Sequence, residues 1–195
     1  MRGANSPRAP WLTLAPLLLS GVFLLLPEAA LEHLTLTPQG VFAGQWWRLW
    51  TGHFVHFSLT HALADGGVIL LCGWYCERRC KASVYAALWL CAPPLLSALL
   101  LLTAPSLHEY RGASGLAMSF ALIAGLTLWR EQPRWRTALL CLSLIFAAKT
   151  LLDALHPPFN TALSGLPADV EVVWQAHLIG ALLGVGGFFA LRKTT

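Results

Sequence analysis

The sequence contains few charged residues. Only 22 of its 195 residues are charged (13 Lys or Arg, 9 Asp or Glu), while 56% are hydrophobic. A soluble domain carries about 25% charged residues, so this chain has too few to cover a surface that faces water. The same composition excludes a disordered chain, and the scarcity of acidic residues excludes an acidic tail. The sequence therefore predicts a membrane protein.

Motifs of metal sites and of repeat proteins are also missing. The chain has no His-Glu-x-x-His metalloprotease pattern and no evident repeat or low-complexity tract. Its five cysteines have no nearby histidine at zinc-site spacing, so we expect them to pack as thiols without disulfides. No metal and no cofactor is predicted.

Six stretches with few charges are candidates for membrane spans. A spanning helix needs about 20 residues, with a range of about 17 to 25, and the first and fifth stretches fall short of that length. The expected spans are roughly 11–26, 53–76, 82–103, 112–129, 137–152 and 172–191. They predict an all-α membrane protein with one six-helix bundle over residues 1–195.

Basic residues orient these spans. With the N-terminus in the cytoplasm, the outer segments hold Arg48, Arg111 and Lys149, and ten basic residues lie on the inner side. The inner ones are Arg2, Arg8, Arg78, Arg79, Lys81, Arg130, Arg134, Arg136, Arg192 and Lys193. This positive-inside bias predicts both termini in the cytoplasm. The net charge of +4 then needs no nucleic-acid partner.

The first stretch has some features of a signal peptide, since basic residues precede a short apolar run. Pro27 and Glu28 make a poor cleavage site before Ala29 and Ala30, however. We therefore expect the stretch to be retained as a span.

Ionisable side chains inside spans are costly and usually mark function. They are His61 and Asp65 in the second span, His177 in the sixth, and Lys149 and Asp153 near the outer end of the fifth. Lys149 and Asp153 are one helical turn apart, so their mutual pairing is the expected explanation.

Counting from the inner face places three side chains at one depth. Ser114, His177 and His61 lie 16, 15 and 16 residues from Arg130, Arg192 and Glu77. At about 1.5 Å per residue, all three stand roughly 22 to 24 Å above the inner boundary of a core about 30 Å thick. A hydroxyl and two imidazoles at one level are what a nucleophile, its base and an oxyanion donor require.

Ser114 stands in Gly112-Ala113-Ser114-Gly115, where an outer loop meets a helix. Glycine allows close approach of other chains, and the free N–H groups of a first helical turn favour an oxyanion. A small-residue helix start that only allows tight packing is the structural alternative.

His177 is the candidate general base. Gly180 and Gly184 follow it on one helix face, where another helix can pack closely. Asp65 lies one turn after His61, so its carboxyl can hold that imidazole or, when protonated, donate a hydrogen bond. A packed neutral histidine and a His/Asp pair that satisfies itself are the alternatives.

Together these residues resemble the rhomboid intramembrane serine proteases. The motifs that carry the resemblance are Trp47-Arg48, the segment from His56 to His61, Gly112-x-Ser114-Gly115, and Ala176-His177-x-x-Gly180-x-x-x-Gly184. The compact six-span core, the segment from Thr51 to His56 and the histidine-to-aspartate pattern are most similar to the rhombosortase branch. The resemblance implies a rhomboid-like six-helix bundle, with Ser114 as the nucleophile, His177 as its base and no third, acidic member.

The resemblance also implies the surroundings of this dyad. His61 and the Ser114 N–H would bind the oxyanion, with Asp65 and Gly112 as further candidates. His56, Arg48 and Met118 would support the site, and the fifth span and the loop after it would gate substrate access. The implied substrate is a single-pass or tail-anchored membrane protein with a Gly-Gly-type C-terminal tail. The implied location is the bacterial inner membrane, with the active site toward the periplasm and the lipid bilayer around it.

Two positions depart from the family pattern. Rhomboids usually have asparagine where this chain has Asp65, and many stack a tyrosine on the catalytic histidine where this chain has Met118. Two other functions stay open at this point. One is a catalytically inactive relative that binds membrane-protein clients. The other is a metal or haem protein that would use His53, His56, His61 and Asp65.

Overall fold

The computed structural model describes residues 10–155, 166, 170 and 172–192. Helices form the regular structure of this part of the chain, beside an isolated bridge between Leu36 and Tyr110. In chain order they are α1 (Trp11–Phe23), α2 (Glu28–Leu34), α3 (Pro38–Phe42), α4 (Arg48–Thr51), α5 (Leu59–Val68), the π-helical turn η1 (Ile69–Gly73), α6 (Trp74–Glu77), α7 (Ala82–Thr103), α8 (Ser114–Glu131), the 3-10 turn η2 (Pro133–Trp135), α9 (Arg136–Leu155) and α11 (Trp174–Arg192). The predicted all-helical fold is confirmed.

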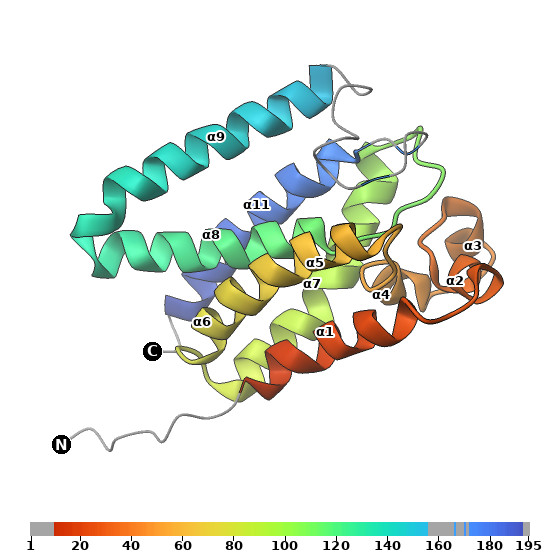
Figure 1. Cartoon of the computed structure of the whole chain (residues 1–195), viewed down its shortest axis with the longest axis horizontal. Helices are drawn as coiled ribbons and strands as arrows, with labels where there is room; N and C mark the ends of the chain where they lie inside the picture. Colours follow the sequence, from red (N-terminus) through yellow and green to blue (C-terminus); the bar gives the residue numbers. More distant parts are fainter. Residues whose placement is uncertain (1–9, 156–165, 167–169, 171, 193–195) are drawn as a thin grey trace.

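Four helical stretches are long and apolar enough to cross a membrane. They are Leu59–Glu77, Ala82–Thr103, Pro133–Leu155 and Trp174–Leu191. α1 is a shorter apolar helix of 13 residues, and α8 has 18 residues, many of them buried inside the bundle. The start of α1 and the end of α11 lie at the same end of the bundle (Figure 1). Of the basic residues used for orientation, Arg2, Arg8 and Lys193 lie outside the described residues.

The second predicted span begins later than expected. The Ser58 hydroxyl accepts the backbone N–H of His61 at 3.1 Å and caps a helix that starts at Leu59. Residues 53–58 instead form a loop, in which His53 and Val55 are fully buried. A buried loop and a membrane helix are equally apolar, so hydropathy alone did not separate them.

α8 and α11 are parallel helices whose backbones touch. A Cβ on Gly180 would lie 2.1 Å from the carbonyl oxygen of Gly115, and one on Gly184 would lie 2.7 Å from that of Ser119. The two contacts are four residues apart on both helices, so one helix runs in register with the other. The Ser119 hydroxyl donates to the Gly180 carbonyl at 2.8 Å and strengthens this seam. Small residues thus fix the register of the pair, and the close packing of another helix on the Gly180 and Gly184 face, which the sequence predicted, is confirmed.

α1 is held by the end of the second span. The Glu77 carboxylate accepts the backbone N–H groups of Leu12 at 3.1 Å and Thr13 at 2.9 Å, together with the Thr13 hydroxyl at 2.6 Å. Thr13 is fully buried and also contacts the Tyr85 hydroxyl at 2.9 Å. The first turn of α1 therefore has its orphan N–H groups satisfied by a carboxylate, which the positive helix end favours.

Side-chain hydrogen bonds hold the long loop after α1, which contains α2 to α4. Arg48 donates to the Gln45 side chain at 2.6 Å and to the carbonyl oxygens of Glu32 and Thr35. Trp50 donates to the carbonyl oxygen of Leu90 at 2.9 Å. That carbonyl is free because Pro94, four residues later in α7, has no N–H to donate. Arg48 thus holds the loop together, and Trp50 ties it to α7.

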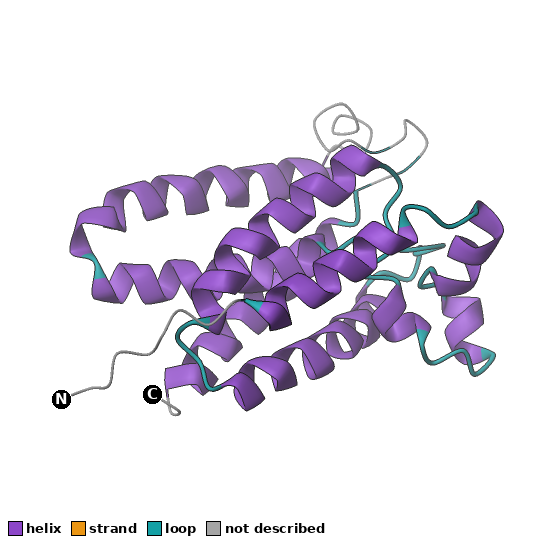
Figure 2. Cartoon of the chain, turned by 60° about the horizontal axis from the view of Figure 1, so that its bottom comes forward, coloured by secondary structure: helices purple, strands orange, loops and turns teal. Residues whose placement is uncertain are grey.

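α9 lies at the edge of the bundle (Figures 1 and 2). Only 6% of its span is buried, against 39% of the α11 span. Asp153 is the single buried residue of this helix. Burying a carboxylate away from water is costly. We therefore expect the interactions of Asp153 to compensate for this cost.

Candidate active site

Ser114 is the first residue of α8 and follows a tightly held loop. Gly112 has φ +132°, a conformation that side chains with a Cβ rarely adopt. A Cβ there would also lie 2.8 Å from the His61 ring. The next backbone N–H, of Ala113, donates to Asp65 Oδ2 at 2.8 Å. Glycine is therefore required in front of the serine, for its backbone angle and for the space that it leaves.

Asp65 is the centre of a buried cluster. Its Oδ2 atom lies 3.4 Å from Nε2 of His56 and 3.4 Å from Nε2 of His61. The two imidazoles meet edge to face at 5.1 Å, and Phe57 stacks on the other side of His61 at 6.2 Å. With the Ala113 N–H, one carboxylate oxygen thus faces three nitrogen atoms. Asp65 is a hydrogen-bond acceptor in this arrangement and links the second span to the loop before Ser114.

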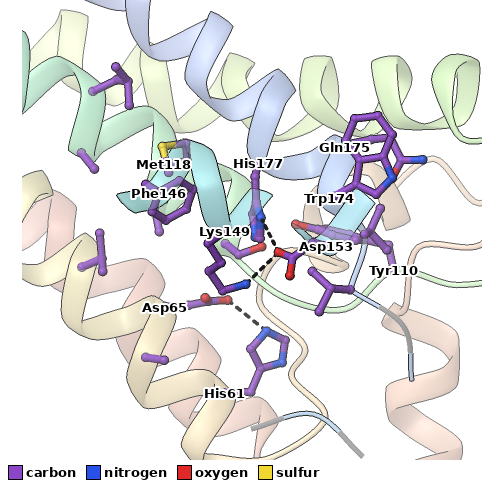
Figure 3. A pocket seen from close by; sticks show the side chains of 18 of the residues that line it. His61, Asp65, Tyr110, Met118, Phe146, Lys149, Asp153, Trp174, Gln175 and His177 are labelled. Carbon is purple, nitrogen blue, oxygen red and sulfur yellow. Dashed lines mark hydrogen bonds and ion pairs between the residues drawn. The ribbon is translucent and has the colours of Figure 1, made fainter. Parts of the chain in front are cut away.

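His177 lies in the first turn of α11 and is 8% exposed. Its Nδ1 atom is 3.8 Å from Asp153 Oδ2 on α9. The same oxygen accepts from Lys149 Nζ at 2.7 Å, which confirms the predicted pairing of Lys149 with Asp153. Phe146, also on α9, contacts the imidazole edge to face at 5.7 Å. Figure 3 shows these α9 side chains around His177.

A second buried network lies behind the serine loop. His53 Nε2 is 2.9 Å from the Ser97 hydroxyl and 3.0 Å from the Pro93 carbonyl oxygen, both on α7. Its ring meets that of Tyr110 edge to face at 5.4 Å. Burial lowers the pKa of His53 to about 4, so this imidazole is neutral and serves as a hydrogen-bonding group. It points to α7 and does not join His56 and His61 at Asp65.

One cavity of about 1110 Å³ collects the predicted catalytic side chains. Its walls come from α5, α8, α9, α11 and the loop before α8, and they include Ser114, His177, His61, Asp65 and Met118. Arg48 lies apart in the first loop, where it holds backbone carbonyls. His56 contributes from behind, through Asp65. The structure therefore brings together a hydroxyl, an imidazole base and a second imidazole, which suits nucleophilic acyl transfer.

Sequence reasoning missed two of the residues around the site. Tyr110 packs on His53, and its backbone pairs with Leu36 in both directions. Phe146 provides an aromatic contact to His177, whereas the family pattern has a tyrosine for this contact at the position that Met118 occupies here. A signal for Phe146 did exist, because Phe146, Lys149 and Asp153 are spaced i, i+3 and i+7 on one helix face.

These features define an integral membrane protein in which a serine and a histidine, from adjacent parallel helices, face one cavity within a helical bundle. A family model of the Rhomboid domain matches residues 43–194, and the chain therefore belongs to the rhomboid family. Members of this family are in general intramembrane serine proteases and act on membrane-protein substrates within the bilayer. No curated protein matches the chain.

Proposed function

We propose that the protein is an intramembrane serine endopeptidase with Ser114 as nucleophile and His177 as general base. The observation that carries this proposal is the cavity that both side chains line from the first turns of α8 and α11. The backbone contact between Gly115 and Gly180 lies beside them. It fixes the relative level of hydroxyl and imidazole without depending on flexible side chains.

The reaction would proceed as an acyl transfer in two halves. The Ser114 hydroxyl gives its proton to His177 while its oxygen bonds to the scissile carbonyl carbon, and the carbonyl electron pair moves onto oxygen. As the C–N bond breaks, His177 returns the proton to the leaving amine. Water then repeats these steps on the ester and frees Ser114. The two departing products are the carboxylate and amine ends of the cleaved chain.

The oxyanion would be bound at the start of α8. The Ser114 N–H and the positive end of the helix favour negative charge there, and His61 contributes a second donor beside Gly112. Asp65 is better suited to accept hydrogen bonds than to donate one to the oxyanion, since its Oδ2 faces the Ala113 N–H and both imidazoles. It would orient His61 and His56 and keep the serine loop in place. Met118 would pack beside the dyad, and Arg48 would stabilise the first loop.

The proposed setting is a six-span protein of the bacterial inner membrane. α1 and α8 would complete the four clearly apolar spans, with both termini in the cytoplasm as the basic residues predict. The cavity would then open near the periplasmic face, from which water reaches it. Similarity of the segment from Thr51 to His56 to rhombosortases supports a substrate with a Gly-Gly-type C-terminal tail, a membrane helix and a basic end.

Co-expression with Gly-Gly-tailed secreted proteins tests this proposal. Ser114→Ala and His177→Ala should abolish cleavage, which mass spectrometry of the new C-terminus measures. Ser83→Ala is the matched control, because Ser83 is exposed on α7 and does not line this cavity, so the variant should cleave like the wild type. Full cleavage by Ser114→Ala would remove the assignment. A folded wild type that a serine-directed fluorophosphonate does not label at Ser114 would favour an inactive client-binding relative.

A further inference from the structure

The side of α9 that faces the helical bundle carries three side chains close to His177. Phe146 contacts the imidazole edge, and Asp153 faces Nδ1. Lys149 binds the same oxygen of Asp153. The exposed fraction of Asp153 is 1%, whereas most of α9 is exposed. The cost of burying this carboxylate calls for a role beyond the helix itself.

Pairing with Lys149 alone does not account for the position of Asp153. An i,i+4 pair satisfies itself on any face of a helix, yet this pair is turned toward the catalytic histidine. His177 Nδ1 is buried and has no hydrogen-bond partner among the described residues. Its distance of 3.8 Å to Asp153 Oδ2 is longer than a hydrogen bond. Such contacts are often loose without substrate and tighten in the reacting complex.

The charges around His177 come from two helices. Asp153 and Lys149 face it from α9, and Asp65 and His61 face it from α5. Asp153 is the nearest carboxylate for which a contact with the ring is seen among the described residues. An acid at Nδ1 leaves Nε2 for the serine, which is the division of roles in a serine, histidine and acid triad.

We propose that Asp153 is a positioning residue for His177, holding its Nδ1–H so that Nε2 faces Ser114, with Lys149 sharing the carboxylate. This rests on the proposed protease function and adds a third, acidic member where the family resemblance implies only a dyad. The proton taken from Ser114 stays on His177 and passes to the leaving amine. Asp153 remains a carboxylate throughout and stabilises the imidazolium while it exists.

The position of α9 then affects the base directly. His177 is set by its own helix at the seam with α8, but the orientation of its ring depends on a side chain from a helix that is otherwise loosely attached. If Asp153 orients His177, the imidazole can accept the Ser114 proton only while α9 is packed against the bundle.

The test uses the purified full chain in detergent and measures how fast a fluorophosphonate labels Ser114, beside kcat and KM for a cleaved substrate. Asp153→Asn should slow labelling about 10- to 100-fold and lower kcat with KM unchanged. Asp153→Glu should recover a large part of the rate. An Asp153→Asn enzyme with normal labelling, or with raised KM and normal kcat, would overturn the proposal.

A charge swap separates the positioning role from the ion pair. The double variant Lys149→Asp with Asp153→Lys keeps an i,i+4 pair but turns an ammonium toward Nδ1. It should label at least as slowly as Asp153→Asn while melting close to the wild type. Wild-type labelling by the swap would show that only the pair matters, and the proposal would fail.

A measurement on the wild type covers the case in which these variants do not fold. The ¹⁵N spectrum of the histidine-labelled protein should show His177 protonated at Nδ1 and bare at Nε2, with His177→Gln identifying the signal. The opposite tautomer overturns the proposal. If the fluorophosphonate does not label Ser114 in the wild type, the proposed protease function is rejected. The tautomer of His177 still tests whether Asp153 holds the Nδ1–H.

Discussion

The two sides of the cavity are built differently. On one side, α8 and α11 touch backbone to backbone through Gly115 and Gly180. On the other side, α9 reaches the site through side chains and buries Asp153 alone. Backbone contact leaves no freedom to adjust, whereas side-chain contact can be lost and remade. The backbone contact therefore fixes the relative level of Ser114 and His177, while the side chains around His177 come in part from the less buried helix α9.

The largest effect is expected from breaking the rigid pair. In Gly180→Ala, the new Cβ would lie 2.1 Å from the Gly115 carbonyl oxygen, and backbone cannot move aside cheaply. We expect a loss of about 3 kcal/mol in the free energy of unfolding and loss of Ser114 labelling. Thermal unfolding in detergent micelles measures the first quantity.

Gly186→Ala is the control on the same helix, since nothing lies within 4 Å of its added Cβ. It should be neutral or stabilise α11 by up to about 1 kcal/mol. Equal melting temperatures for the two variants would show that the α8–α11 contact is not tight.

A smaller effect is expected from disturbing the loop in front of the serine. Gly112→Ala would strain a backbone with φ +132° and push a Cβ to 2.8 Å from the His61 ring. Displacing that ring should slow Ser114 labelling about 100-fold, with most of the molecule still folded. The labelling rate per folded molecule is the measurement.

Gly44→Ala is matched to this change. Gly44 also has a positive φ, +89°, but nothing lies within 4 Å of its added Cβ. Its backbone penalty is similar and its labelling rate should be normal. Slow labelling in both variants would show that backbone strain at a positive φ is the cause, and that the contact with His61 is not.

The smallest effect is expected on the α9 side. Phe146→Leu removes the aromatic contact to His177, and such contacts are worth about 0.5 to 1.5 kcal/mol, or roughly a 2- to 10-fold lower labelling rate. The melting temperature should not change, because α9 contributes little to the core. The neighbouring Ile145, 67% exposed, provides the control Ile145→Leu. A large drop in melting temperature for Phe146→Leu would contradict the view of α9 as loosely attached.

Some of the cavity-lining residues could be predicted from the sequence. Counting from inner-face charges placed Ser114, His177 and His61 at one depth, and all three line one cavity. The count works because a spanning helix rises by a fixed amount per residue. The close approach at Gly180 was also predictable, since small residues at i and i+4 leave a flat face.

Contacts that depend on helix rotation could not be predicted. The i,i+4 spacing predicted the pairing of Lys149 with Asp153. The spacing could not predict that α9 is rotated so that this pair faces His177. Tyr110 was missed because its role comes from a loop contact with Leu36, far away in sequence. The start of α5 was missed because a buried loop is as apolar as the helix after it.

The Glu77 cap on α1 has a consequence for how the chain enters the membrane. The carboxylate that satisfies the N–H groups of Leu12 and Thr13 belongs to a residue 65 and 64 positions later. When the first helix leaves the ribosome, its partner has not yet been synthesised. The Leu12 N–H must stay hydrated until the second span has been synthesised, whereas the Thr13 N–H also bonds to the Pro10 carbonyl oxygen at 3.1 Å. Residues 11–77 are thus the smallest insertion unit in which the Leu12 N–H has its carboxylate partner.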